Sequence, residues 1–92
     1  MKEKFIKAIT KEIEERYSFN IIVSIECPSI CLQNVHNLEV TEIEETETTF
    51  DIDTTDMCFK IGKNYTKISY DEHENEYTFN YENGVVITIT II

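Results

Sequence analysis

Carboxylates are the side chains most available for chemistry in this sequence, and they are concentrated in one part of it. The 92 residues include 18 Asp and Glu against 8 Lys and Arg, which gives a formal net charge of −10. No Lys or Arg lies between Tyr17 and Phe59. A field of this sign attracts basic proteins and repels nucleic acid and anionic membranes. Six acids in this segment are the candidate partner-binding residues: Glu42, Glu44, Glu45, Glu47, Asp51 and Asp53.

The spacing around these acids predicts a β-hairpin. Residues 38–44 and 48–54 have the alternation of two strands, and the segment 45–47 between them would form the turn. In that register Glu42 lies opposite Asp51, on the face turned away from the apolar residues. Two more acids lie diagonally on the same face: Glu44 and Asp53.

The apolar residues of the first of these strands do not keep one phase. Leu38 and Val40 share one parity, whereas Ile43 has the other. A β-bulge near Thr41 or Glu42 would bring all three to one face. Like charges opposite one another destabilise a sheet, so these four acids on one side of the hairpin indicate a role in binding. The alternative is a solvated face that keeps a small domain soluble.

Part of the same segment has the spacing of a calcium loop. Asp51 and Asp53 alternate and Asp56 follows, but the glycine and the final glutamate of such a loop are missing. Ile52 between the first two acids favours a strand. We therefore expect an ordinary strand face here and no metal.

The cysteines and one histidine form a permitted zinc ligand set. Three Cys and one His can bind zinc, and the chain has Cys27, Cys31 and Cys58 with His36. Three residues separate the first two thiols and the last is distant, which is not a standard zinc spacing. Free Cys is among the most buried residue types. We expect buried or incidental thiols and no cofactor.

No arrangement of residues predicts catalysis. Cys27 and Cys31 lie in an acidic stretch, which raises the pKa of a thiol and opposes nucleophilic chemistry. His36 and His73 have polar neighbours and are expected in exposed loops. Paired carboxylates need a pocket that separates their pKa values, and a small meander offers little cleft. We therefore expect a protein that is not an enzyme.

Tyrosines cluster near three lysines in the C-terminal third. Interleaved aromatic and basic residues can bind single-stranded nucleic acid, but three lysines in so acidic a chain make a weak electrostatic footprint. Packing on the sheet with hydroxyls at the surface is the main expectation, and a protein contact stays open. The residues are Tyr65, Tyr70, Tyr77 and Tyr81, with Lys60, Lys63 and Lys67.

An amphipathic helix is predicted at residues 3–17. Its apolar stripe recurs at three- and four-residue steps and consists of Phe5, Ile6, Ile9, Ile13 and Tyr17. The first turn has no strong N-cap. Three opposite-charge pairs are expected four residues apart on the polar side: Glu3 with Lys7, Lys11 with Glu15, and Glu12 with Arg16.

Strands are predicted along most of the remaining chain. Residues 19–26 alternate, and Pro28 would begin a short helical turn that holds Ile30, Cys31 and Leu32. Further strands are expected at 57–61, 65–70 and 77–81, and the segment 71–76 forms a polar loop. Gly62 and Gly84 are expected in turns.

The last segment predicts a hairpin. Asn83-Gly84 is the dipeptide preferred in type I′ turns. The alternation of Val85, Ile87, Ile89 and Ile91 follows it. A strand with this many apolar residues would promote aggregation at an exposed edge. We therefore place it inside the sheet, against the N-terminal helix.

These elements predict one α+β domain over residues 1–92. One N-terminal amphipathic helix would pack on an antiparallel, meander-like β-sheet of five to seven strands. The odd number of cysteines and the lack of a continuous apolar segment near the start favour a reducing compartment, so a cytoplasmic location is expected. No apolar run approaches the length that spans a bilayer.

In size, charge and plain architecture the chain resembles the small acidic inhibitors made by phages and mobile elements, such as anti-restriction and anti-CRISPR proteins. The resemblance covers no motif, so it assigns no site residue. It implies a DNA mimic that occupies the basic nucleic-acid-binding surface of a target protein. Two alternatives stay open: an immunity or antitoxin protein that neutralises a basic nuclease toxin, and a structural or assembly subunit that self-associates through its C-terminal strand.

Overall fold

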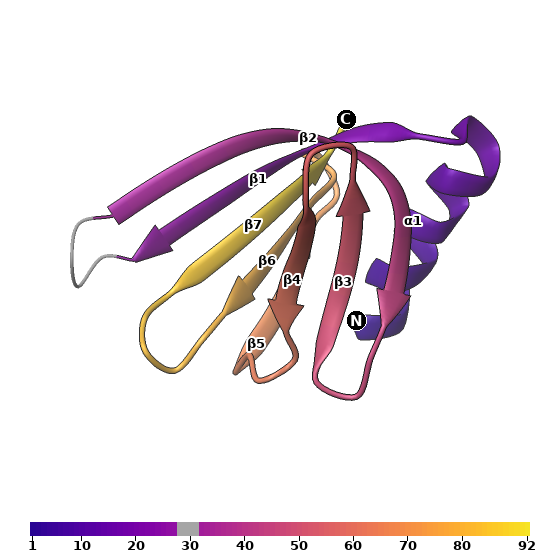
Figure 1. The fold of residues 1–92 in the computed structure, drawn as a ribbon. Coiled ribbons are helices and arrows are strands. Elements are labelled where there is room, and N and C mark those ends of the chain that lie inside the picture. Colours follow the sequence, from indigo (N-terminus) through magenta and orange to yellow (C-terminus); the bar gives the residue numbers. More distant parts are fainter. Residues whose placement is uncertain (28–31) are drawn as a thin grey trace.

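One helix and seven strands follow one another along the chain in the computed structural model, which describes residues 1–27 and 32–92 (Figure 1). The predicted α+β class is confirmed, with seven strands in the antiparallel sheet. The elements are α1 (Lys2–Arg16), β1 (Phe19–Cys27), β2 (Leu32–Glu45), β3 (Thr49–Thr54), β4 (Cys58–Gly62), β5 (Lys67–Asp71), β6 (Glu76–Asn80) and β7 (Val86–Ile91).

The helix buries the predicted stripe except at its end. Phe5 and Ile9 are fully buried, and Ile6 and Ile13 pack against the same core. Tyr17 does not belong to this stripe. Its backbone is left-handed (φ 64°), and its N–H donates to the Ile13 carbonyl at 2.8 Å, which ends the helix and leaves the ring 87% exposed.

The sheet has the order β4-β3-β2-β1-β7-β6-β5, and all neighbours are antiparallel. Two meanders, β1 to β4 and β5 to β7, are therefore joined through the β1–β7 ladder. The predicted internal place of the last strand is confirmed, because β7 pairs with β1 on one side and β6 on the other. Val23 and Tyr77 flank the buried Ile89.

The sheet is strongly curved, and its connectivity requires this. β4 and β5 are consecutive in the chain but form opposite edges of the sheet. In a flat sheet the edges of seven strands would lie roughly 29 Å apart, whereas the link between Gly62 and Lys67 spans about 18 Å at most. The Tyr81 hydroxyl donates to the Gly62 carbonyl at 2.9 Å, which ties β4 to the chain just after β6.

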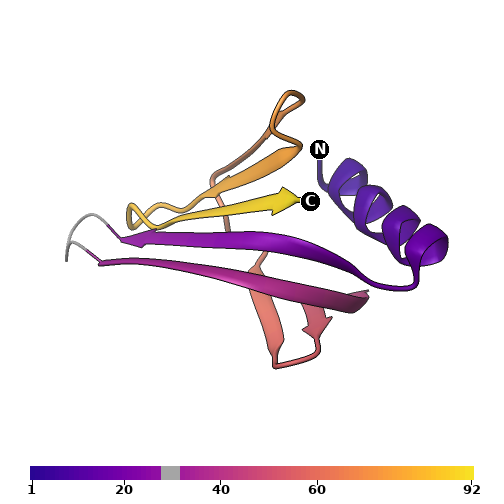
Figure 2. The ribbon, with the colours of Figure 1, turned by 90° about the horizontal axis from the view of Figure 1, so that it is seen from above.

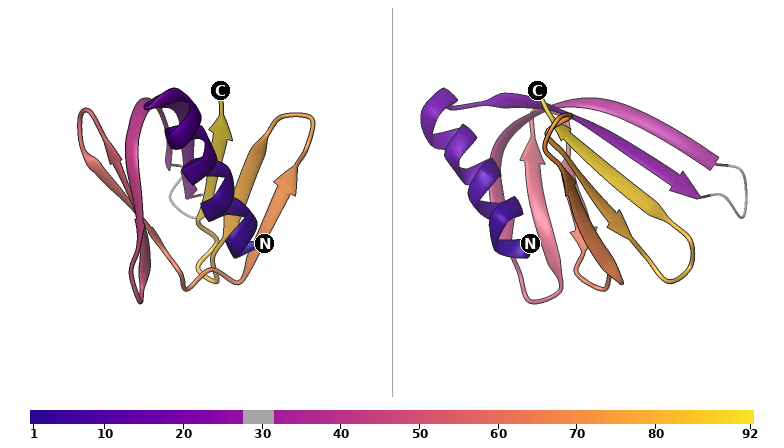
Figure 3. Two further views of the ribbon diagram at one scale, coloured as in Figure 1. Left: turned by 90° about the vertical axis from the view of Figure 1, so that its right-hand side faces the viewer. Right: turned by 180° about the vertical axis from the view of Figure 1, so that it is seen from behind.

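The helix fills the concave side of this sheet. Figures 2 and 3 show α1 between the arm formed by β3 and β4 and the arm formed by β5 and β6. The Phe5 ring contacts rings from both arms, with centroids 5.5 Å from Phe50 and 5.1 Å from both Tyr77 and Phe79. One helical side chain thus joins the two halves of the core.

The start of β2 differs from the prediction. The expected helical turn after Pro28 lies mainly outside the described residues, but Leu32 belongs to β2 and pairs with Cys27. His36 is consequently a strand residue opposite Val23, not a loop residue, although its side chain is exposed as expected. The ladder with β1 overrides the weak local pattern of this segment.

The turn before β7 is not type I′. Only Gly84 has a positive φ (87°), whereas a type I′ turn needs two such residues. The Gly84 N–H donates to the Tyr81 carbonyl and the Tyr81 N–H donates to the Val85 carbonyl, both at 3.0 Å. This is a three-residue loop with glycine in the left-handed position, and the Asn83 carboxamide accepts the Val85 N–H.

Candidate functional site

Four of the six predicted acids share the outer, convex face of β2 and β3. The pairs are Glu42 with Asp53 and Glu44 with Asp51, so the predicted pairing of Glu42 with Asp51 is wrong by two residues. The bulge predicted near Thr41 is confirmed, since the register shifts between Val40 and Glu42.

The turn explains the difference in register. The Thr46 N–H donates to the Thr49 carbonyl at 2.8 Å, and the Thr46 hydroxyl accepts the N–H groups of Thr48 and Thr49. These bonds close the turn around residues 47–48, whereas the sequence predicted it at 45–47. Ile43 and Ile52 then pair on the concave side.

Asp51 differs from its neighbours because it forms an ion pair with Lys60. Lys60 on β4 lies opposite it, with its ammonium 2.9 Å from the carboxylate, and the Thr49 hydroxyl donates at 2.6 Å. The Thr49 hydrogen bond and then the Lys60 hydrogen bond lower the pKa of Asp51, and the Asp51 carboxylate raises the pKa of Lys60. Glu42, Glu44 and Asp53 form no ion pair with a described residue.

Glu45 and Glu47 lie away from this face. Glu45 pairs with the buried Phe50 and therefore sits on the concave side, where its carboxylate is 2.5 Å from the Lys63 ammonium and 3.4 Å from that of Lys2. The Lys63 hydrogen bond is the largest cause that lowers the pKa of Glu45. Glu47 is an exposed residue of the turn.

Three exposed carboxylates thus remain available on one surface. We call the residues Glu42, Glu44 and Asp53 the acidic face; Asp51 lies among them but is held by Lys60. Their strand positions fix their separations, because alternate side chains of a strand repeat about every 6.5–7 Å on one face. The arrangement can bind cationic side chains.

Cys27 and Cys58 form no metal site with other side chains that the structure describes. Across residues 1–27 and 32–92, no group of three or more His, Cys, Asp or Glu side chains is placed to hold a metal ion. Cys31 lies outside those ranges. Cys58 is exposed opposite Asp53, and hydrogen bonding to that carboxylate is the main cause that raises the pKa of its thiol. This direction disfavours the nucleophilic thiolate.

The tyrosines pack on the sheet, but their hydroxyls are engaged more closely than predicted. Tyr77 is 1% exposed, and its hydroxyl donates to the Lys4 carbonyl at 3.4 Å. The Tyr70 hydroxyl donates to the Asn75 side chain at 3.0 Å. Burial, and secondarily the nearby Tyr65, raises the pKa of Tyr81 to about 12.

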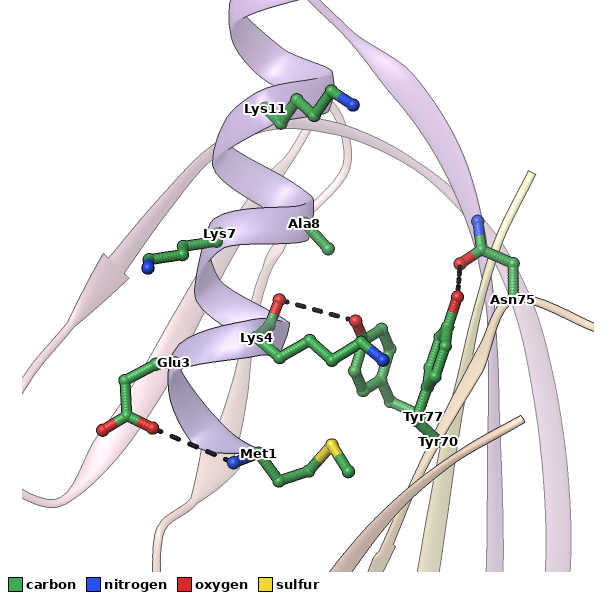
Figure 4. A pocket seen from close by; sticks show the side chains of 9 residues that line it. All are labelled: Met1, Glu3, Lys4, Lys7, Ala8, Lys11, Tyr70, Asn75 and Tyr77. Carbon is green, nitrogen blue, oxygen red and sulfur yellow. Dashed lines mark hydrogen bonds and ion pairs between the residues drawn. The ribbon is translucent and has the colours of Figure 1, made fainter. Parts of the chain in front are cut away.

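A groove that the sequence did not predict lies between α1 and these tyrosines (Figure 4). Its volume is about 570 Å³. The walls include Lys4, Lys7, Ala8 and Lys11 from α1, with Tyr70 and Tyr77 opposite them. The helical spacing of the lysines was visible in the sequence, but only the fold places them beside two aromatic rings.

No protein-family model, curated protein or solved structure matches the chain. Among the described residues, α1 is the single helix, and it is too short and too polar to cross a membrane. The fold and its surfaces define a small α+β protein with an acidic strand face and a separate lysine-lined groove.

Proposed function

We propose that the protein binds a basic surface of another protein through its acidic face. The observation that carries this proposal is the direct pairing of acids across β2 and β3, Glu42 with Asp53 and Glu44 with Asp51. Such pairing costs folding free energy, and Lys60 offsets only the second pair. A binding role accounts for the retention of an arrangement that the fold does not need.

The target we propose is the nucleic-acid-binding surface of an enzyme, which the protein occupies as a DNA mimic. The 6.5–7 Å repeat of alternate strand side chains is close to the spacing of phosphates along a DNA strand. Glu42 and Glu44 on β2 have this repeat, and so do Asp51 and Asp53 on β3. An inhibitor of the anti-restriction or anti-CRISPR type would act in this way, in the cytoplasm and without catalysis.

Retention of partners from source-cell lysate at two salt concentrations tests this function. We expect a basic nucleic-acid enzyme to bind at about 0.1 M salt and to be released at about 0.5 M, where the Debye length falls from roughly 10 to 4 Å. Mass spectrometry identifies the retained protein.

Two charge-matched variants make the test specific. Glu42→Gln, Glu44→Gln and Asp53→Asn together remove three charges from the acidic face, whereas Glu14→Gln, Glu15→Gln and Glu72→Gln remove three from exposed positions elsewhere. We expect the first variant to lose the partner and the second to keep it. Equal loss would show that overall charge decides binding, and equal retention would place the interface elsewhere.

The two alternatives predict different results in the same experiment. An immunity or antitoxin protein would use the same acidic face and retain a nuclease toxin. A self-associating subunit would retain only copies of itself at both salt concentrations. Self-association through the C-terminal strand is not supported, since β7 already pairs with β1 and β6.

A further inference from the structure

The basic residues fall into two groups that differ in their partners. All eight lie in the part of the chain that the structure describes, and four form ion pairs: Lys2, Arg16, Lys60 and Lys63. The other four form none with a described residue. Three of these line the groove beside α1, namely Lys4, Lys7 and Lys11, and the fourth is Lys67 on β5.

The ion pairs predicted along the helix are largely absent, which leaves these charges available. Of the three expected pairs, Glu12–Arg16 forms, at 2.6 Å, whereas Lys7 and Lys11 form no pair within the described residues. The chain has a net charge of −10, so lysines without a carboxylate partner make this part of the surface positive where most of it is negative. Glu3 is the one acid among the residues that line the groove.

The groove combines these charges with apolar walls. Figure 4 shows Lys4, Ala8 and Lys11 on the side of α1 that faces the tyrosines, whereas Lys7 points away from them, on the same side as Glu3. The Lys4 ammonium lies 3.9 Å from the centroid of the Tyr70 ring. Ala8 leaves room between the two lysines that face the rings.

We propose that this groove binds a short, extended, acidic segment of a partner protein. Lys11 lies seven positions after Lys4 on the helix, a rise of about 10 Å, and about three to four residues of extended chain cover the same length. Carboxylates at alternate positions of such a segment reach the lysines, and apolar side chains between them contact Ala8 and the partly exposed Tyr70. Tyr70 belongs to β5, an edge strand of the sheet, beside which an extended peptide can run.

The geometry disfavours other anions. A single phosphate cannot contact lysines distributed over about 10 Å of helix. Nucleic acid binding on a stacking platform needs an accessible aromatic face, but the Tyr70 ring already contacts the Lys4 ammonium and the Tyr77 ring, whose centroid is 4.6 Å away. The net charge of the chain also repels a long polyanion.

Peptide titration by fluorescence anisotropy tests the proposal. The probe is a labelled, capped peptide in which glutamate and leucine alternate, and its control has glutamine in place of glutamate. We expect the acidic peptide to bind and the glutamine peptide to bind far more weakly. Equal binding of the two peptides would overturn the proposal, and so would binding of neither at millimolar concentration.

Matched lysine variants locate the site. Lys11→Gln removes an unpaired lysine from the groove, whereas Lys67→Gln removes one outside it. We expect about a two- to five-fold loss of affinity for the first and no loss for the second. Lys4→Gln combined with Lys11→Gln should multiply the loss. Equal effects of Lys11→Gln and Lys67→Gln would show that the peptide is attracted by overall charge and does not bind in the groove, which would overturn the proposal.

Competition and the acidic-face variant separate this site from other possibilities. Displacement of the peptide by oligo-dT or by inorganic phosphate, each at the peptide's own concentration, would identify a different ligand and overturn the proposal. The variant Glu42→Gln, Glu44→Gln, Asp53→Asn should bind the acidic peptide at least as well as the unmodified protein. These experiments can disprove peptide binding by the groove without affecting the proposed function of the acidic face. Loss of partner binding by the acidic face would likewise leave the groove proposal unaffected.

Discussion

The concave and convex faces of the sheet are built by alternate residues of the same strands, yet they differ in what they contribute. On β2 and β3 the concave pair Ile43–Ile52 packs towards the core, whereas the flanking pairs on the convex side are Glu44–Asp51 and Glu42–Asp53. No polar or charged residue is buried among the described residues. Stability therefore comes from the concave side, and the convex side is free to carry charge.

The largest expected effect comes from placing a charge on the concave face. Ile89→Asp should unfold the protein at a cost of several kcal/mol, because Ile89 is fully buried on a strand paired on both sides and the new charge has no partner. Thr88→Asp, one residue away on the convex face, should leave the fold intact. Circular dichroism melts of both variants measure the difference, and an unchanged melt for Ile89→Asp would contradict the placing of β7.

A smaller effect is expected where the edge strand β4 is tied to the segment just after β6. Tyr81→Phe removes the hydrogen bond to the Gly62 carbonyl and should cost about 1 kcal/mol in chemical unfolding. Tyr17→Phe, at an exposed ring, should cost nothing measurable.

Because the pKa of the Tyr81 hydroxyl is raised, we also expect the protein to lose stability at alkaline pH. This pKa is about 12 in the folded protein against an ordinary 10.0, so the contribution of the hydroxyl is complete below pH 10 and is lost as the pH rises towards 12. Stability measured from pH 9 to 12 should therefore fall less steeply in Tyr81→Phe than in the unmodified protein. Parallel curves would contradict burial of this hydroxyl.

A still smaller effect is expected from single acids that lie on opposite faces of β2. Glu45→Gln should lower stability at neutral pH, because it removes contacts with Lys63 and Lys2, whereas Glu44→Gln should not. The lowered pKa of Glu45 means that its contribution is present above its ordinary value of 4.5 and is lost as the pH falls below it. Melts at pH 7 and pH 3 should show a smaller acid loss in Glu45→Gln, and identical losses in both variants would contradict this pairing.

The smallest effect should come from the acidic face itself. Glu42→Gln, Glu44→Gln and Asp53→Asn together relieve repulsion across β2 and β3 and should raise the melting temperature by a few degrees at most. Asp51 is left in place because Lys60 and Thr49 hold it. A clear loss of stability would mean that the acids of the convex face support the fold.

Much of the fold could be predicted because local patterns and long-range packing agree. The stripe of Phe5 and Ile9 defined the helix, and the break in phase between Val40 and Ile43 located the bulge. The start of β2 was missed, because the ladder with β1, not the local sequence, makes Leu32 a strand residue. The turn at Gly84 was misassigned because Asn-Gly also fits a three-residue loop.

The candidate sites were less predictable, since they depend on register and on contacts between distant segments. A shift of two residues in pairing changed the partner of Glu42, and strand parity moved Glu45 to the other face. The groove was invisible because Lys4 is 66 positions from Tyr70 in the chain, and nothing local indicates their contact. The sequence even suggested the opposite, because Glu3 and Glu15 lie four residues from Lys7 and Lys11, and only the structure shows that these pairs do not form.

The β1–β7 ladder has a consequence for how the molecule assembles. Every other ladder between described strands joins consecutive strands and can form as a local hairpin, whereas β1 and β7 pair across about sixty residues, at a large loop-closure entropy. We therefore expect formation of this ladder to limit the folding rate. Until β7 pairs with it, β1 presents an open edge, so an incomplete chain that lacks β7 is prone to association with other chains through β1.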